Sequence, residues 1–429
     1  MEKKIGIAVI GLGYVGLPLA VAFSKKFQVI GYDSNKSRIS ELKKGFDKTG
    51  SLKTKNLKNK KLHFCFDINM LKNSNIFLIT VPTPVTKSKK PDLKSLINAT
   101  TKVAKIIDEN SYVVFESTVY PGLTEEVCIP ILEKYSKLKL NKNLFVGYSP
   151  ERINPGDNQN SILKIKKIVS GSNIKTLNFL NKLYNSVLKG GTHKVKSIKI
   201  AEAAKISENA QRDLNISLMN ELSLIYSKMD IDTNEVLKAM KTKWNALKFL
   251  PGLVGGHCIS VDPYYLTYKS EKLGYRPSVI HSGRKINEFI PKYIIQKLIK
   301  ILRNKKIDLN KIKVGVFGLS FKEDCKDFRN SKVINMINEL KKKKVSTLLY
   351  DPIISIHDFK KMYKGMKFWK TKDKVDVIIL SVAHKIFKNY SIAKLKSFFK
   401  NKEKPIVIDV KSIYNKQKLE KNGFTVWSL

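Results

Sequence analysis

IGIAVIGLGYVG, residues 5–16, is the stretch that decides the fold of this chain. Its first six residues form a continuous apolar run, which is typical of a strand buried on both faces of a parallel sheet. The next six have the Gly-x-Gly-x-x-Gly spacing of a turn that opens a helix. A second apolar stretch, 27–32, ends at Asp33, which lies 22 residues after Gly11. The pattern predicts a strand, a glycine turn and a helix that together bind a dinucleotide.

In such a turn the first glycine permits the tight bend, the second lets a pyrophosphate approach the backbone, and the third allows the helix to pack closely on the strand. The helix N-terminus adds amide donors and a partial positive charge. Asp33 is expected to bind the adenosine ribose and to repel a 2′-phosphate, which favours NAD over NADP, although Lys36 and Arg38 weaken that preference. The expected cofactor contacts of this segment are Gly11, Gly13, Tyr14, Val15, Gly16 and Asp33.

Strand and helix patterns alternate on both sides of a helical middle section. Further strands are predicted at 76–81, 112–115, 144–147, 314–319, 348–351, 377–382 and 405–410. The stretch 201–229 has apolar residues at helical spacing and no Pro or Gly, which predicts one long helix. The basic stretch 36–61 is predicted to carry a mobile loop.

The last third of the chain looks like a partial repeat of the first. Gly31-Tyr32-Asp33 has a counterpart in Leu349-Tyr350-Asp351, and 314–319 resembles the opening strand and turn, but the full glycine spacing is missing. We therefore expect an α/β fold with two Rossmann-like parallel-sheet domains joined by a long central helix. The second domain is expected to bind a nucleotide differently, or to bind a different nucleotide.

Composition is that of a globular protein, with 429 residues, 42% hydrophobic and 9% aromatic. No apolar run reaches the ~18 residues of a membrane-spanning helix, and the N-terminus has no signal-peptide pattern, so a cytoplasmic protein without membrane attachment is expected. The four cysteines include no Cys-x-x-Cys pair. We expect neither a disulfide framework nor a metal site.

The formal net charge of +45 raises the possibility of nucleic-acid binding. Only seven of the 81 basic residues are arginines, and the remaining 74 are lysines spread along the chain. Phosphate-binding surfaces usually cluster their charge and use more arginine, so we expect no specific nucleic-acid partner. Where composition favours lysine, the few arginines are expected to serve forked, bidentate contacts.

Cys258, in Gly255-Gly256-His257-Cys258-Ile259-Ser260-Val261-Asp262, is the candidate nucleophile. A cysteine alone is more often a small buried apolar residue, but here glycines let backbone amides approach a ligand and Asp262 lies four residues on. A thiolate can trap an aldehyde that a nicotinamide site produces. His257 is expected to be structural or to contact substrate, because adjacent side chains of an extended loop point apart.

Lys205, Asn209 and Arg212 are spaced i, i+4, i+7 and share one helix face. The alternative is a solvated basic face, which is common in this chain. The asparagine favours a face turned towards a polar ligand, where a lysine could stabilise an oxyanion. Two further segments follow predicted strands at the edge where α/β ligands bind, namely 116–122 and 149–156.

Taken in order, these segments resemble the UDP-glucose/UDP-N-acetylsugar 6-dehydrogenase family over nearly the whole chain. The matching motifs are IGLGYVGLPLA, VPTP, ESTVYPG, YSPERINPG, AEAAKISENAQRDLNISLMNE, TKWN…PGLVGGHCISVDPYYLTYK, SGRKIN and LSFKEDCKDFRNS. The YSPERINPG and GGHC forms are closest to the branch that oxidises UDP-N-acetyl-D-glucosamine or UDP-N-acetyl-D-galactosamine. The one departure noted is Ser260, where related sequences more often carry Gly or Pro.

The resemblance implies roles for particular residues. Cys258 would form the thiohemiacetal and thioester, while the groups that stabilise oxyanions, hold water and relay protons would be Lys205, Asn209, Asp262, Thr118 and Glu151. NAD would also contact Thr83, Thr118 and Arg329. The UDP-sugar would contact Glu151, Arg152, Lys205, Asn209, Arg212, Phe249, Gly256, Arg284, Phe321 and Lys322.

The resemblance also implies an NAD-binding domain at 1–199, a central helical and dimerisation domain with the cysteine loop at 200–305, and a UDP-binding domain at 306–429. The implied activity is NAD-dependent oxidation of the C6 hydroxymethyl of a UDP-N-acetylhexosamine to the acid, for surface polysaccharide synthesis, by a homodimer. UDP-glucose 6-dehydrogenase is the main alternative. A basic nucleic-acid binder and a sugar-nucleotide binder without catalysis are the alternatives from other classes.

Overall fold

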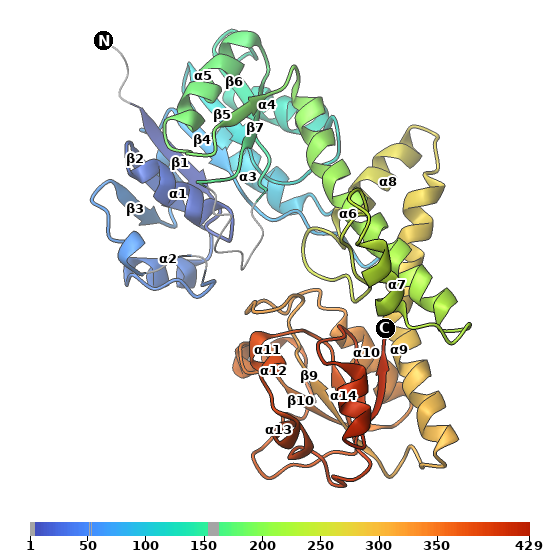
Figure 1. Ribbon diagram of the computed structural model, residues 1–429. Coiled ribbons are helices and arrows are strands. Elements are labelled where there is room, and N and C mark those ends of the chain that lie inside the picture. The colour runs from blue at the N-terminus through green and yellow to red at the C-terminus, as the bar shows by residue number, and fades with distance from the viewer. Residues whose placement is uncertain (1–4, 51, 53, 153–162) are drawn as a thin grey trace. The chain divides into compact units, whose positions relative to one another are not determined.

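The structure is a computed structural model that describes residues 5–50, 52, 54–152 and 163–429 (Figure 1). The chain divides into two compact units, each with its own sheet. The first unit comprises Met1–Asn209 and Val261–Arg276, and the second comprises Ala210–Ser260 and Pro277–Leu429. Helix α6 (Ile198–Tyr226) begins in the first unit and ends in the second.

The first unit is built on an eight-stranded sheet in the order β3-β2-β1-β4-β5-β6-β7-β8. Its strands are β1 (Gly6–Ile10), β2 (Gln28–Tyr32), β3 (Leu62–Cys65), β4 (Ile76–Ile79), β5 (Ser111–Phe115), β6 (Leu144–Tyr148), β7 (Lys167–Gly171) and β8 (Thr192–Lys194). Neighbouring strands are parallel, except that β6 and β7 are antiparallel. The order reverses between β1 and β4, which is where open α/β sheets bind ligands at the carboxyl ends of their strands.

Alternate residues of these strands belong to two cores. Ile7 and Val9 of β1 pack with α1, α2 and α5, whereas Ala8 and Ile10 pack with α3, α4 and the start of α6. Because both faces are covered, the strands read as continuous apolar runs. The helices of this unit are α1 (Gly16–Ser24), α2 (Lys36–Lys43), α3 (Lys94–Ala104), α4 (Ile129–Ser136), α5 (Ile174–Asn185) and α8 (Asp262–Lys272), with the short turns η1 (Thr54–Asn56), η2 (Ile68–Leu71) and η3 (Thr124–Cys128).

The second unit has a five-stranded, fully parallel sheet in the order β10-β9-β11-β12-β13. Its strands are β9 (Lys313–Phe317), β10 (Ser346–Tyr350), β11 (Val377–Leu380), β12 (Ile406–Asp409) and β13 (Thr425–Ser428). Helices α9, α10 and α11 share one core with the sheet, and α12, α13 and α14 share the other. The helices are α7 (Thr233–Met240), α9 (Ser278–Asn304), α10 (Val333–Lys342), α11 (Ile356–Met362), α12 (Lys385–Lys388), α13 (Ile392–Lys396) and α14 (Lys416–Lys421).

The partial repeat that the sequence suggests is visible in the hydrogen bonds after β1 and β9. The Leu12 N–H donates to Asp33 Oδ2 at 2.9 Å, and the Leu319 N–H donates to Asp351 Oδ2 at 2.7 Å. In the second unit a buried histidine, His384, also lies against this carboxylate, with Nε2 3.1 Å from Asp351 Oδ2. Two Rossmann-like parallel-sheet units and a long central helix, as predicted, therefore define the fold.

The predicted strands and the long helix agree with the structure to within a few residues. The 29-residue helix predicted at 201–229 is α6, also of 29 residues, three positions earlier. The sequence analysis missed β3, β8 and β13, which lie at sheet edges, and β7, which lies between β6 and β8. It also missed α2 inside the stretch 36–61, where the Asn35 side chain caps the helix by accepting from the Ser37 and Arg38 N–H groups.

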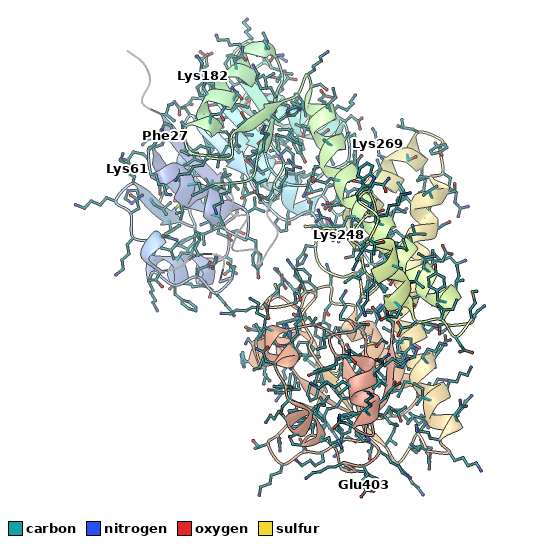
Figure 2. All side chains as sticks on the ribbon, in the orientation of Figure 1. Phe27, Lys61, Lys182, Lys248, Lys269 and Glu403 are labelled. Atoms are coloured by element: carbon teal, nitrogen blue, oxygen red, sulfur yellow. The ribbon has the colours of Figure 1, made fainter. Side chains whose placement is uncertain are left out.

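The basic charge is dispersed over the surface. Figure 2 shows Lys61 and Lys182 projecting from different parts of the first unit, and Lys248 from the second. Among the described residues no helix is both long and apolar enough to cross a membrane.

Candidate active site

The three glycines of the opening motif have three different environments. Gly11 has φ +94°, a value that residues with a side chain rarely adopt. A Cβ on Gly16 would lie 1.9 Å from the Gly11 carbonyl oxygen, so only glycine fits there. Around Gly13, by contrast, no atom of the described residues beyond Gly13 and its two chain neighbours lies within 4 Å of the position of a Cβ. The turn thus has a bend, a close packing point and an open backbone face, and this arrangement fits a dinucleotide pyrophosphate.

Asp33 and Arg38 fix this turn from the next strand and helix. The Asp33 carboxylate accepts from the Leu12 N–H, and Arg38 Nε donates to the Leu12 carbonyl at 3.0 Å. The Arg38 guanidinium also pairs with Glu41 and with Asp47, the latter at 2.8 Å. These contacts engage the Arg38 guanidinium with groups of the chain itself, and the side chain is 9% exposed.

Loops at the carboxyl ends of β4, β5 and β6 are joined by hydrogen bonds. The Ser117 hydroxyl donates to the Val81 carbonyl at 2.6 Å, and the Thr83 hydroxyl donates to the Thr118 carbonyl at 2.7 Å. The Tyr148 hydroxyl donates to the Ser117 carbonyl at 3.1 Å. Thr83 and Thr118, two of the predicted cofactor contacts, are thus brought together at the edge where the sheet order reverses.

Glu151 and Arg152 follow β6 at the same edge. Both are half-buried, and the Arg152 N–H donates to Glu151 Oε1 at 2.6 Å. The Arg152 guanidinium grips Glu208 of α6 with two bonds, Nε to Oε2 at 3.3 Å and Nη2 to Oε1 at 2.8 Å. This is a forked contact of the kind expected for the few arginines. The remainder of this motif, 153–156, lies outside the described residues.

Lys205 and Asn209 of α6 meet Asp262 at the start of α8. All three are buried, and Asn209 Nδ2 donates to Asp262 Oδ2 at 2.5 Å. Burial raises the pKa of Asp262 to about 6, and the Lys205 ammonium and the Asn209 hydrogen bond oppose that rise. A carboxyl group with this pKa can accept and release a proton near neutral pH. Arg212, predicted on the same helix face, is exposed.

The cysteine loop lies in the second unit. Cys258 is half-buried inside the turn 256–260, which the Ser260 hydroxyl closes by donating to the Gly256 carbonyl at 2.6 Å. Gly256 has φ +89°, and a Cβ there would lie 2.7 Å from the Phe321 ring. Gly256 and Phe321, two predicted substrate contacts, are therefore side by side.

His257 is directed at a carboxylate of the second unit. Its Nε2 lies 3.4 Å from Asp327 Oδ2. Arg329 clasps the same carboxylate with Nε at 2.9 Å and Nη2 at 2.7 Å. Burial alone would raise the pKa of Asp327, but the hydrogen bond with His257 and the contacts with Arg329 outweigh it and lower that pKa strongly. His257 thus has a structural partner, which agrees with the expectation that it is not the base for the adjacent cysteine.

Arg284 is the most enclosed of the predicted substrate contacts. It is 2% exposed, its Nη1 donates to Asp213 Oδ1 at 2.6 Å, and its Nη2 bonds Glu288. Phe249 and Lys322 are half-buried elsewhere in the second unit. The structure thus groups the predicted residues within each unit: the turn, the sheet edge and the Lys205–Asn209–Asp262 cluster in the first, and the cysteine loop with Gly256 and Phe321 in the second.

Sequence reasoning missed several buried polar residues around these segments. Glu202 of α6 is fully buried and accepts from the Gly122 N–H at 2.6 Å and the Thr124 N–H at 3.0 Å. It lies three residues before Lys205, so helical spacing could have placed it on the same face. In the second unit Asn220 holds Gly252, with its Oδ1 accepting from the Gly252 N–H at 2.7 Å.

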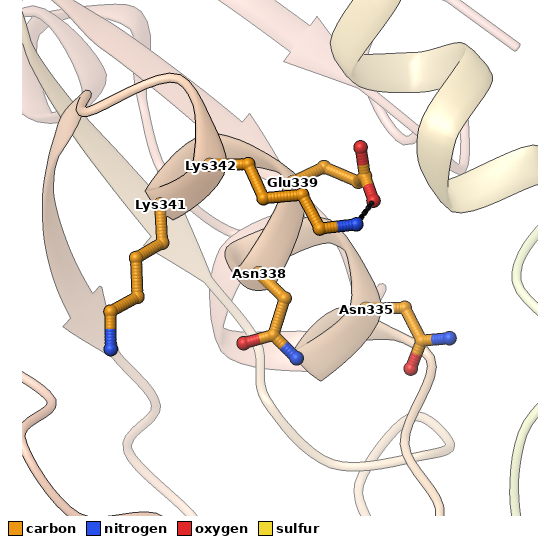
Figure 3. A pocket seen from close by; sticks show the side chains of 5 residues that line it. All are labelled: Asn335, Asn338, Glu339, Lys341 and Lys342. Carbon is orange, nitrogen blue, oxygen red and sulfur yellow. Dashed lines mark hydrogen bonds and ion pairs between the residues drawn. The ribbon is translucent and has the colours of Figure 1, made fainter.

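The second unit also has a surface hollow on α10. Figure 3 shows its lining, which comes from one helix, α10: Asn335, Asn338, Glu339, Lys341 and Lys342. Its internal contact is an exposed ion pair of 2.6 Å between Lys342 and Glu339. None of the predicted site residues lines it, so we assign it no part in the chemistry.

A glycine turn fixed by Asp33, at the switch point of an α/β sheet, is typical of the class of dinucleotide-binding proteins. Comparison with known proteins gives its family. Residues 5–188 match the NAD binding domain of the UDP-glucose/GDP-mannose dehydrogenase family, 199–289 match its central domain, and 315–416 match its UDP binding domain. The chain belongs to this family, and it is an NAD-dependent oxidoreductase of UDP-sugars.

Individual relatives are similar over their whole length. The chain is 49% identical to Protein CapL of Staphylococcus aureus over 96% of this chain and 97% of that protein. It is 45% identical to the UDP-N-acetyl-D-glucosamine 6-dehydrogenase of Pseudomonas aeruginosa over 97% and 99%. Among solved structures, the UDP-D-ManNAc dehydrogenase of Pyrococcus horikoshii superimposes with a TM-score of 0.87 at 29% identity, over 99% of both chains.

Proposed function

We propose that this enzyme oxidises the C6 hydroxymethyl of a UDP-N-acetylhexosamine to a carboxylate through a thiohemiacetal and a thioester on Cys258. The observation that carries the proposal is the buried Asn209–Asp262 hydrogen bond beside Lys205, in a chain whose Cys258 precedes Asp262 by four residues. Relatives named UDP-N-acetyl-D-glucosamine 6-dehydrogenase, 45% and 44% identical, support the N-acetylated substrate.

The chemistry divides among the chain's own residues. NAD, when bound, would supply the hydride acceptor, and a second NAD molecule would replace the reduced first one before the second oxidation. The Cys258 sulfur adds to the aldehyde carbon after the first, and Lys205 and Asn209 stabilise the oxygen there. After the second, water adds to the thioester carbon, the C–S bond breaks and the thiolate leaves. Asp262 takes up protons released in these steps, since its pKa of about 6 leaves it mainly ionised at neutral pH.

Other predicted residues hold the ligands and the water. Thr118 and Glu151 position the attacking water, and Thr83 and Arg329 contact NAD. The UDP-sugar contacts are Arg152, Arg212, Phe249, Gly256, Arg284, Phe321 and Lys322. The three functional domains remain at 1–199, 200–305 and 306–429, within a cytoplasmic enzyme of surface polysaccharide synthesis.

We also propose a homodimer. Large apolar side chains are exposed along α6, α7 and the following segment of the second unit, and Trp244 is 92% exposed. They are Leu218, Ile225, Met229, Met240, Trp244, Leu247 and Leu250. Light scattering of the purified protein is expected to give twice the mass of 48.9 kDa. A monomer at micromolar concentration would contradict the dimer and leave the proposed chemistry untouched.

The deciding experiment follows NADH at 340 nm with UDP-GlcNAc, UDP-GalNAc, UDP-ManNAc and UDP-glucose separately. Turnover of one N-acetylhexosamine with two NADH per sugar is the expected result. Preference for UDP-glucose would establish the alternative substrate, and one NADH per sugar would mean that oxidation stops at the aldehyde. Release of the acid by Cys258→Ser at close to the wild-type rate would exclude the thioester.

A further inference from the structure

Lys167 is a buried lysine in a chain whose other lysines are mostly solvated. It begins β7, is 4% exposed, and its ammonium has four oxygen atoms around it. Nζ donates to Glu116 Oε2 at 2.5 Å, to the Ser149 carbonyl at 3.2 Å and to the Pro150 carbonyl at 3.2 Å, and it lies 4.0 Å from Glu151 Oε2. The three hydrogen-bond contacts account for the three donors of an ammonium group.

These contacts tie two loops of the candidate site together. Glu116 directly follows β5 and stands two residues before Thr118, whereas Ser149 and Pro150 directly follow β6 and precede Glu151. One ammonium therefore fixes the backbone that carries Glu151 to the backbone that carries Thr118. Both are residues for which we propose a role in holding the attacking water.

The groups around Lys167 favour a positive charge at this position. The Tyr184 hydroxyl of α5 bonds the second oxygen of Glu116, and the Tyr184 ring lies 5.5 Å from the ammonium. Burial raises the pKa of Glu116 to about 7, the Lys167 ammonium opposes that rise, and the nearby Glu151 carboxyl adds to it. Two carboxyl groups thus share one ammonium. Glu116 neutralises the positive charge of Lys167 only in part, and the remaining charge attracts the Glu151 carboxylate.

We propose that Lys167 is a positioning residue for hydrolysis of the thioester, because it orients the Glu151 carboxylate and the loop of Thr118 towards the attacking water. The inference rests on the proposed function. An alternative is that the Lys167–Glu116 pair only stabilises the sheet edge. Buried ion pairs can often be replaced by apolar groups without loss of stability, so stability and catalysis can be separated here.

The test uses the double variant Lys167→Met, Glu116→Gln, which removes the ammonium and also neutralises the carboxylate that pairs with it directly. Lys167→Met alone leaves Glu116 without its cation and risks misfolding. Glu116→Gln alone is the matched control, because it keeps the ammonium beside Glu151. Each variant is mixed rapidly with saturating NAD and UDP-sugar, NADH is followed at 340 nm, and the protein is quenched for intact-mass measurement.

We expect the double variant to form two NADH per active site rapidly and then to turn over about tenfold to a hundredfold more slowly than wild type. A sugar adduct on Cys258 should accumulate in the quenched protein, and Glu116→Gln should show less of both effects. Equal slowing of the burst and of turnover, with no adduct, would overturn the inference. Failure of wild type to form a uronic acid would instead overturn the proposed function, so the two failures are distinct.

Discussion

The side-chain amide of Asn209 donates a hydrogen bond of 2.5 Å to Asp262 Oδ2, joining α6 to the first residue of α8. Hydrogen bonds to a carboxylate favour its charged form, whereas burial disfavours it. Asp262 is 2% exposed, and burial prevails, so its pKa rises to about 6. Asn209 therefore limits how far this rise goes.

Asn209→Ala should move the acid limb of the kcat–pH profile upward. Without the donor the pKa of Asp262 rises further above 6, and more of the group is protonated at pH 7. We expect kcat at pH 7 to fall by about a hundredfold, partly because an oxyanion donor is lost as well. kcat is measured from pH 5 to 9. Lys238→Ala, which breaks an exposed pair with Glu235, is the control, and an unmoved limb in Asn209→Ala would refute the argument.

Arg38→Lys should weaken NAD binding without opening the site to NADP. A lysine cannot contact the Leu12 carbonyl, Glu41 and Asp47 at once, so the glycine turn loses support. We expect KM for NAD to rise roughly tenfold, which corresponds to about 1.4 kcal/mol. Steady-state kinetics with both cofactors provide the measurement, and Lys182→Arg is the control because Lys182 is exposed and lies on α5, outside the glycine turn. A gain of NADP turnover in Arg38→Lys would contradict this expectation, because it would show that a cationic side chain at position 38 reaches the 2′-phosphate.

The sequence predicted the parts of the site that depend on local spacing. The three glycines, Asp33 and the pair Lys205–Asn209 follow from motif and helix periodicity. Long-range partners could not be derived in this way, because Asp262 lies 53 residues from Asn209 in the sequence and nothing local pairs them. The burial of Lys167 could not be predicted either, because its sequence neighbours do not distinguish it from the other lysines of the chain.

The contacts of the arginines among the predicted site residues can be compared with the expected forked geometry. Arg152 and Arg329 each make the expected forked contact with both oxygens of one carboxylate. Arg284 instead divides its nitrogens between Asp213 and Glu288. Their partners, however, are carboxylates of the chain itself. Composition indicates which residue type is needed, but only the fold determines whether its partner is a ligand or a neighbour.

Glu202→Gln should lower stability, and the loss should shrink as pH rises. Burial raises the pKa of Glu202 to about 7, whereas in the unfolded chain it titrates near 4.5, so the folded state binds the extra proton between these values. Its contribution to stability is then present below about pH 4.5 and is lost as pH rises through 7. Gln has a single acceptor oxygen, which leaves the Gly122 or Thr124 N–H unsatisfied at a cost of about 1–3 kcal/mol.

Chemical denaturation of wild type and Glu202→Gln between pH 5 and 8 measures this difference. The gap in unfolding free energy should be largest at pH 5 and smallest at pH 8. Exposed Glu403→Gln is the matched control and should show no such trend. A gap that widens with pH would mean that Glu202 is held as a carboxylate, with the sign of the linkage reversed.

Ser260→Ala should loosen the turn that holds Cys258. The Ser260 hydroxyl is buried and donates to the Gly256 carbonyl at 2.6 Å, so it closes a turn in which Cys258 is the middle residue. The sequence analysis noted this serine as a departure from related sequences, and the structure shows that its hydroxyl bonds within the loop. Removing the bond should cost about 1 kcal/mol of stability. The substitution should also slow alkylation of Cys258 less than it slows turnover. Turnover needs the sulfur in one position, whereas iodoacetamide can react with the sulfur in many positions.

Iodoacetamide labelling of Cys258, read by peptide mass, and kcat are compared in wild type, Ser260→Ala and Ser260→Thr. Threonine keeps the hydroxyl and should restore kcat if its methyl group fits. Such a rescue would show that loss of the hydroxyl, and not the change in side-chain size, lowers kcat in Ser260→Ala. If Ser260→Ala matches wild type in both measurements, Gly256 and its contact with Phe321 are sufficient to hold the turn. Gly256, which has φ +89° and lies against the Phe321 ring, would then be the residue that fixes the position of Cys258.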